Sequence, residues 1–151
     1  MAAVLLVTAI CVMDSSAQTS RASVSASEVN GTFRYYFTGK YRGSTNEIKI
    51  LALGKGKLKV AFELVYPFTD GSGELSANLG QATGVAEIVG DTAVYRSEEF
   101  GTCTITIKFV KPGTIRVEQD GGSACGFGHN VSATGNYRRI SGKKPKFDQP
   151  E

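Results

Sequence analysis

The sequence CTITIKFVKPGTIRVEQDGGSAC (residues 103–125) contains the clearest strand pattern and the clearest turn of the chain. Over residues 102–110 apolar and polar side chains alternate, which is the period of a half-buried strand. The alternation resumes over residues 114–119, after Pro112-Gly113, a pair that suits the two central positions of a reversing turn. The stretch therefore predicts an antiparallel hairpin.

The same kind of pattern extends through most of the chain. Short turns separate the segments and leave no room for crossover helices, so we expect one all-β domain over residues 32–140, an antiparallel meander of eight or nine strands. Closure into an eight-stranded barrel removes exposed edges, and a β-sandwich is the alternative. The similar fragments TGKYR (38–42) and TGNYR (134–138) favour first and last strands that are neighbours. The remaining strands are expected over 32–41, 47–53, 57–66 (ended by Pro67), 74–79, 82–89, 92–96 and 130–140.

The segment before this domain has the features of an export signal. Residues 1–17 contain an apolar run of about a dozen residues followed by small polar ones, shorter than the roughly 20 residues of a membrane span. We interpret them as a signal peptide, the only expected helix, and expect a secreted or periplasmic protein without a transmembrane span in the mature chain. Ser-rich residues 18–31 are expected to form a flexible lead that carries no fold, and residues 141–151 a basic tail.

Export also determines how the cysteines are interpreted. In an oxidising compartment Cys103 and Cys125 are expected to pair, closing a loop that stabilises the fold by about 3 kcal/mol. If Lys111 lies opposite Thr114, Cys103 lies opposite Gly122, so the bridge should join the hairpin to the start of the next strand. No metal or cofactor is expected, because two thiols and one histidine do not match a zinc-site spacing.

Charge is unevenly distributed along a chain whose net charge is +3. Removal of residues 1–17 leaves 17 basic and 13 acidic side chains, a net charge of +4. Residues 34–59 and the tail are mainly basic, whereas residues 70–99 are mainly acidic. These segments are either solvated strand faces or, for the basic ones, a surface for an anionic partner such as lipid headgroups, cell-wall polymer or an acidic protein.

No catalytic constellation is recognisable, so the protein is not expected to be an enzyme. His129 could activate a neighbouring serine, but no third orienting group is identifiable. The adjacent Glu98 and Glu99 would point to opposite faces of a strand, whereas paired-carboxylate chemistry needs convergence. Aromatic and basic residues mix over residues 32–42, yet the strand period places most of the rings inside, so no specific nucleic-acid partner is expected.

The segments CGFGHNV (125–131) and ATGNYR (133–138) resemble those of small exported bacterial proteins that end in a CGFGxNVxAxGxYxR-type segment. Some of these are similar in layout to the periplasmic lysozyme inhibitors, which insert a short Ser-Gly-containing loop and a Tyr into the enzyme cleft. Here Thr38–Tyr41 and Thr134–Tyr137 are near matches, with Thr in place of Ser. The resemblance implies an exported, non-enzymatic binding module, possible partners being a cell-wall hydrolase or another envelope component.

Two functional hypotheses follow. The first is recognition by loops and outward side chains, in its most concrete form inhibition of a lysozyme-type hydrolase. The second is a small barrel that carries an apolar ligand, although narrow barrels tend to fill their interior with side chains. The candidate binding residues are Tyr36, Tyr41, Asp70, Phe127, His129 and Tyr137. The candidate lining of a ligand cavity comprises Phe33, Tyr35, Phe62 and Phe109.

Overall fold

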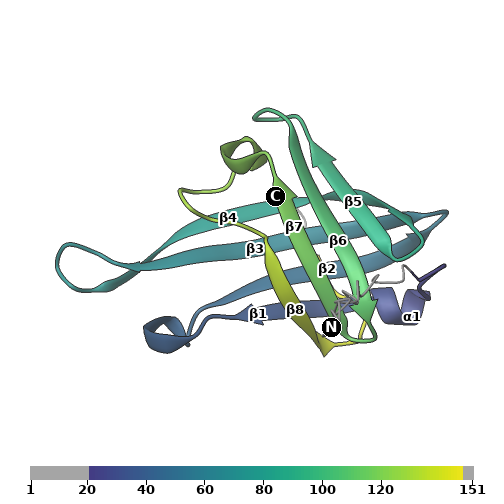
Figure 1. The fold of residues 1–151 in the computed structure, drawn as a ribbon, viewed down its shortest axis with the longest axis horizontal. Helices are drawn as coiled ribbons and strands as arrows, with labels where there is room; N and C mark the ends of the chain where they lie inside the picture. The colour runs from purple at the N-terminus through teal and green to yellow at the C-terminus, as the bar shows by residue number, and fades with distance from the viewer. Residues whose placement is uncertain (1–20, 148–151) are drawn as a thin grey trace, which may run out of the picture.

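The computed structural model describes residues 21–147, which form a closed barrel of eight antiparallel strands (Figure 1). Each strand pairs with the next, and β8 pairs with β1. The predicted all-β meander and its closure into a barrel are therefore confirmed. The expected signal peptide lies outside the described residues. The strands are β1 (Gly31–Tyr36), β2 (Thr45–Gly54), β3 (Lys57–Thr69), β4 (Leu75–Val89), β5 (Thr92–Ser97), β6 (Cys103–Lys111), β7 (Thr114–Asp120) and β8 (Gly135–Ser141), and the helical elements are α1 (Ala26–Val29), η1 (Gly39–Tyr41) and η2 (Gly122–Cys125).

Alternating side chains of the strands pack inside the barrel. On β6, Ile107 and Phe109 are buried, as their period-two spacing predicted. Phe109 meets Phe33 edge to face with ring centroids 6.4 Å apart, and Phe62 packs on Tyr95 at 5.4 Å. Burial of one such side chain stabilises the fold by about 1.5–3 kcal/mol. These rings therefore contact one another within the hydrophobic core, which disfavours their use as the lining of a ligand cavity.

The β6–β7 hairpin forms with one change of register. Lys111 lies opposite Thr114, as predicted. A bulge immediately before Lys111 shifts the remaining pairs by one position, so that Thr104 lies opposite Asp120. A bulge adds one unpaired residue to one strand, which a simple alternation of side chains does not reveal.

The predicted Cys103–Cys125 disulfide is present, with the two Cα atoms 4.8 Å apart. Because of the bulge, the expectation that Cys103 faces Gly122 is wrong. The bridge joins β6 to η2, immediately after β7, rather than to the beginning of β8. At Gly121, the residue before η2, φ is 106° and a Cβ atom would collide with the Thr102 carbonyl oxygen, so glycine is required.

Two breaks expected in the long hairpin do not occur. β4 continues through Gly80, although strands were predicted on either side of it. β3 continues past Pro67. The Val65 amide donates to Asn46 Oδ1 at 2.8 Å, so the backbone N–H positions of odd-numbered residues in this part of β3 face β2. The pairing of β2 with β3 ends at Glu63. Pro67 has the same parity, and its missing N–H removes no bond of the ladder.

The first strand is shorter than predicted. β1 ends at Tyr36, and the chain then forms η1, with Gly39 at a φ of 62°. Tyr41 therefore lies in a half-exposed turn instead of on the inner face of a strand. The fragments 38–42 and 134–138 have different conformations despite their similar sequences, although the first and last strands are neighbours.

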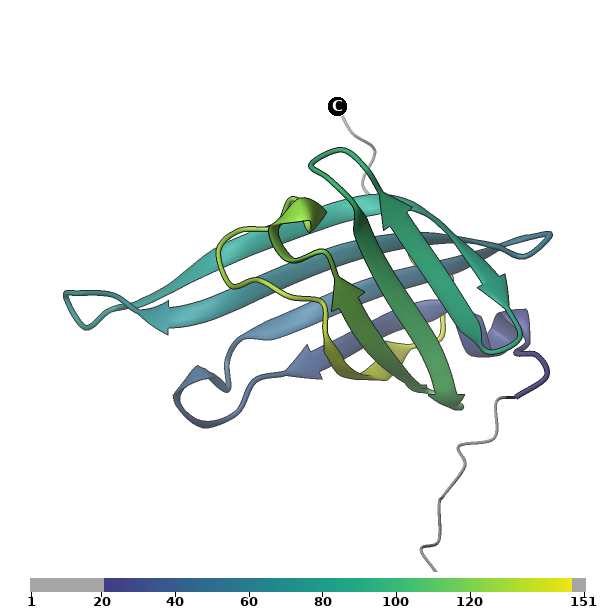
Figure 2. The same cartoon turned by 45° about the horizontal axis from the view of Figure 1, so that its top comes forward.

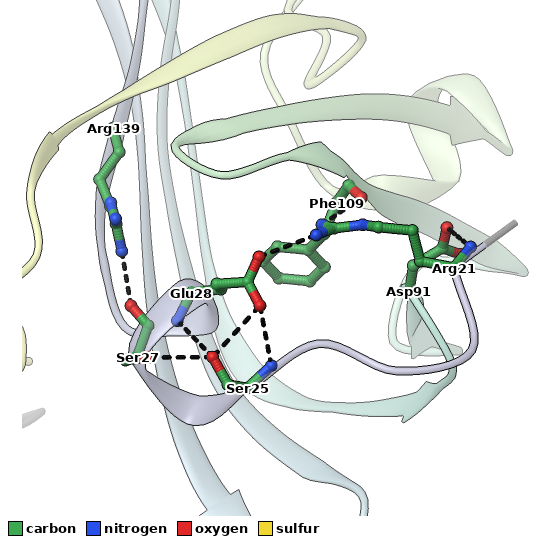
Figure 3. A network of polar contacts seen from close by, with 7 residues as sticks. All are labelled: Arg21, Ser25, Ser27, Glu28, Asp91, Phe109 and Arg139. Atoms are coloured by element: carbon green, nitrogen blue, oxygen red, sulfur yellow. Dashed lines mark hydrogen bonds and ion pairs between the residues drawn. The ribbon is translucent and has the colours of Figure 1, made fainter.

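The segment before β1 also differs from the expected unstructured lead, since residues 21–30 pack onto the barrel (Figure 3). Ser25 and Glu28 form a capping box that begins α1. The Arg21 guanidinium donates to Glu28 at 2.8 Å and to the Phe109 carbonyl oxygen at 2.9 Å, while its backbone amide donates to Asp91 at 2.9 Å. The segment is thereby fastened to the β4–β5 turn and to the end of β6.

The two ends of the barrel differ in their connections (Figures 1 and 2). One end has the two-residue turns at 55–56, 90–91 and 112–113, together with α1. We call it the turn end. The other end has longer connections, and we call it the loop end. Its loops are residues 37–44, 70–74, 98–102 and 121–134.

Candidate functional site

The loop end brings together most of the residues that the sequence singled out. Tyr36 ends β1, Tyr41 lies in η1, and Asp70 begins the β3–β4 turn. Phe127 and His129 belong to the loop 121–134, which we call the closing loop. Candidates that are far apart in sequence therefore lie at one end, on loops that a packed barrel supports. Loops held by a rigid scaffold are common positions for binding residues.

The Tyr41 turn rests against the β3–β4 hairpin. Lys40 Nζ lies 4.9 Å from the centre of the Tyr41 ring and 3.2 Å from Thr69 Oγ1. The Ser44 amide donates to the Tyr41 carbonyl oxygen at 2.8 Å, which closes the turn. Interaction with Lys40, and secondarily with Thr69, lowers the pKa of the Tyr41 hydroxyl. The turn presents a phenol and an ammonium group side by side to solvent.

Asp70 organises the tip of the hairpin. Its Oδ1 accepts bonds from the Ser72 hydroxyl at 2.6 Å, the Ser72 amide at 2.9 Å and the Glu74 amide at 3.0 Å. These bonds, foremost the one from the Ser72 side chain, hold the pKa of the carboxyl below its ordinary value. Asp70 is exposed, but its geometry serves the loop itself.

The hairpin extends beyond the rest of the barrel as an arm, residues 65–79 (Figures 1 and 2). On its outward side Val65 pairs with Leu79, whereas Pro67, the partner of the exposed Ala77, is itself buried. Leu79 is 64% exposed. The arm therefore adds an apolar surface to the polar loops of this end.

The closing loop runs from the end of β7 to contact β4. Phe127 packs against Gly80, and the Gly128 amide donates to the Leu79 carbonyl oxygen at 3.0 Å. The Asn78 side chain donates to the His129 carbonyl oxygen at 2.8 Å. Phe127 is thus a packing residue, only 9% exposed, whereas His129 is exposed. A hollow of about 500 Å³ on this loop is lined by Gln119, Gly122, Ser123, Phe127, Gly128, His129, Asn130, Val131 and Ser132.

Tyr137 does not belong to the surface, which corrects its proposal as a binding residue. Its side chain is fully buried, and its hydroxyl donates to the Ala133 carbonyl oxygen at 2.9 Å. Burial raises the pKa of this hydroxyl far above its ordinary value. The reason is its position on the inner face of β8, beside Tyr35, with ring centroids 5.9 Å apart.

A buried residue that the sequence analysis missed, Asn46, holds the closing loop to the barrel wall. Its Oδ1 accepts the Val65 amide, and its Nδ2 donates to the Ser132 carbonyl oxygen at 3.5 Å. Asn46 is 4% exposed. Its position directly after a Gly-Ser-Thr turn gave no signal that distinguished it from a solvated loop residue.

The loop end differs in charge from the chain as a whole. Its loops contain two basic side chains, Lys40 and Arg42, against four carboxylates. None of these carboxylates forms an ion pair within residues 21–147. An overall basic protein therefore presents an acidic set of loops. The carboxylates are those of Asp70, Glu74, Glu98 and Glu99.

Within residues 21–147 no three His, Cys, Asp or Glu side chains are grouped as metal ligands. No helix of that region is long and apolar enough to cross a membrane. Comparison with known proteins gives no match: no family model, no curated protein and no solved structure is significantly similar to this chain.

Proposed function

We propose that this protein is an exported, non-enzymatic binding module whose loop end recognises a basic partner protein. Its most concrete form is an inhibitor of a lysozyme-type cell-wall hydrolase. The observation that carries the proposal is the acidic character of the loop end on an otherwise basic chain. Many lysozymes are themselves basic, and complementary charge accelerates encounter and orients the partners.

The Tyr41 turn supports the inhibitor form. Of the two segments that resemble the inhibitor loop, Thr38–Tyr41 is a turn at the loop end with Tyr41 half-exposed, whereas Thr134–Tyr137 leads into the core. A tyrosine on a braced turn can enter a cleft with little loss of conformational entropy. Tyr41 is therefore the proposed anchor.

The test is a titration of purified protein against lysozymes of several classes acting on cell-wall substrate. Inhibition is expected to rise with protein concentration for at least one class. Tyr41→Ala is expected to weaken inhibition about 30-fold, the cost of a central interface tyrosine. Leu53→Ala removes a half-exposed side chain at the turn end and serves as the control. A flat titration against every class, combined with tight uptake of a fatty acid, would replace the proposal by the ligand carrier.

The charge argument has its own test in association rates. Glu74→Gln/Glu99→Gln removes two loop-end carboxylates that form no ion pair with a described residue. The double variant is expected to associate several-fold more slowly and with a weaker dependence on salt. Glu87→Gln/Glu118→Gln makes the same change of net charge on the barrel wall. Equal slowing by both variants contradicts recognition at the loop end.

A further inference from the structure

The outer wall formed by β6, β7 and β8 carries cations in positions that oppose one another. Lys108 lies directly opposite Arg116 across the β6–β7 pair. Like charges placed directly opposite on antiparallel strands destabilise the sheet. The fold therefore maintains a repulsive pair on this wall.

A second group of cations lies on the same wall nearer the turn end. Lys111 is opposite Thr114, and Thr114 is opposite Arg138. On its other side Arg138 faces Arg34, a further pair of like charges. An open hollow of about 500 Å³ lies among these strands. It is lined by Lys111, Gly113, Thr114, Asn136, Arg138 and Arg139.

We call Lys108, Lys111, Arg116 and Arg138 the basic face. The ion pairs recorded within residues 21–147 join Arg21 to Glu28, Arg34 to Glu47 and Lys49 to Glu63, so none involves the basic face. Glu118 lies beside it on β7, two residues beyond Arg116. The four cations are thus without a carboxylate partner among the described residues.

We propose that the basic face binds an anionic phospholipid surface. Its cations are spread over three adjacent strands of the outer barrel wall, a width of about 10 Å, and the hollow beside them is open, so the arrangement suits an extended surface rather than an enclosed ligand. Ile140 lies two residues after Arg138 on the same outward face of β8 and is 43% exposed, so it offers an apolar contact to the membrane surface. The outward side chains of β6–β8 include no aromatic ring, whereas single-stranded nucleic acid is bound by stacking on such rings.

This orientation is compatible with the proposed function but does not depend on it. The basic face is on the side of the barrel, and the acidic loops are at one end. A protein that lies with this wall on a membrane leaves its loop end free for a partner protein.

The experiment is co-sedimentation of the protein with vesicles of phosphatidylcholine, with and without phosphatidylglycerol. Binding is expected only to the anionic vesicles and is expected to weaken as salt is added. Each cation removed is expected to weaken binding about fivefold, so Lys111→Gln/Arg138→Gln should bind about 25-fold more weakly. Lys55→Gln/Lys57→Gln makes the same change of charge at the β2–β3 turn and is expected to retain binding.

Three outcomes would overturn the proposal. The first is equal weakening by both double variants, which would show attraction to net charge alone. The second is binding that inorganic phosphate or soluble glycerol phosphate abolishes at unchanged ionic strength, which would show a small-anion site. The third is tight binding to single-stranded nucleic acid with no binding to anionic vesicles. Failure of lysozyme inhibition would leave the lipid result unaffected, since that assay contains no membrane.

Discussion

Gly80 on β4 offers a direct test of how the closing loop is held. A Cβ atom at this position would lie 2.8 Å from Val131 Cγ1 and 2.9 Å from both Cβ and Cδ1 of Phe127. These distances are shorter than van der Waals contact. Gly80→Ala therefore pushes the closing loop away from β4 without altering any charge.

Two responses are available to the protein, and their costs differ. Complete release of the loop would expose Phe127 and Val131, at about 1.5–3 kcal/mol for each side chain. Overpacking with the loop in place costs about 1–3 kcal/mol of stability. Alanine offsets about 0.5–1 kcal/mol of this cost, because it loses less backbone entropy than glycine when it is ordered in a strand. The loop is therefore expected to shift but remain bound, with a net loss of about 1 kcal/mol.

Thermal denaturation should show this as a decrease in Tm of about 4 °C. Hydrogen exchange should be faster at the Gly128 amide, which donates to the Leu79 carbonyl oxygen. Gly43→Ala is the matched control, because no atom lies within 4 Å of a Cβ at that exposed position. If Gly80→Ala leaves both Tm and the exchange of Gly128 unchanged, the described packing of the closing loop is refuted.

Three further predictions concern the disulfide, the core and acid. Cys103→Ser/Cys125→Ser should lower the free energy of unfolding by about 3 kcal/mol in denaturant titrations, the entropy of the 22-residue loop, and an unchanged midpoint would contradict it. Tyr137→Phe should lower the free energy of unfolding by about 1 kcal/mol, because the Ala133 carbonyl oxygen loses its hydrogen bond from the hydroxyl. Tyr137→Ala should lower it by about 3–5 kcal/mol. If the tyrosine were exposed, neither variant would lose stability. The pKa of Asp70 is lowered, so its carboxylate stabilises its loop at pH values above the ordinary pKa near 3.8 and ceases to do so as the pH falls through the folded-state pKa. The amide NMR signals of this loop should therefore change in acid, and Asp70→Asn should abolish that change.

Much of the barrel follows from local alternation of side chains. The Pro112-Gly113 turn and the buried face of β6 are local features, and both were predictable. The continuity of β4 through Gly80 was not, because this glycine makes room for Phe127, which is distant in sequence, rather than marking a turn. The register beyond the β6–β7 bulge likewise depends on one extra residue that leaves no compositional trace.

The candidate site was predictable in part for similar reasons. Asp70 stands among residues that favour turns, and the structure has a turn at this position. Tyr41 and Tyr137 occupy nearly identical pentapeptides, yet one lies in a turn and the other in the core, because tertiary packing decides between them. The capping box of Ser25 and Glu28 was present as a Ser-x-x-Glu spacing and could have revealed α1.

Pro67 has a consequence for the behaviour of the protein at high concentration. The arm leaves the outer edge of β3 unpaired beyond Glu63, and an unpaired edge is a template on which a second chain can add a strand. Pro67 offers no N–H along that edge and is itself buried, so a second strand would find neither a donor nor free backbone at the middle of the arm. The residue that ordinarily interrupts strands is therefore expected to disfavour addition of a second chain to this protruding one.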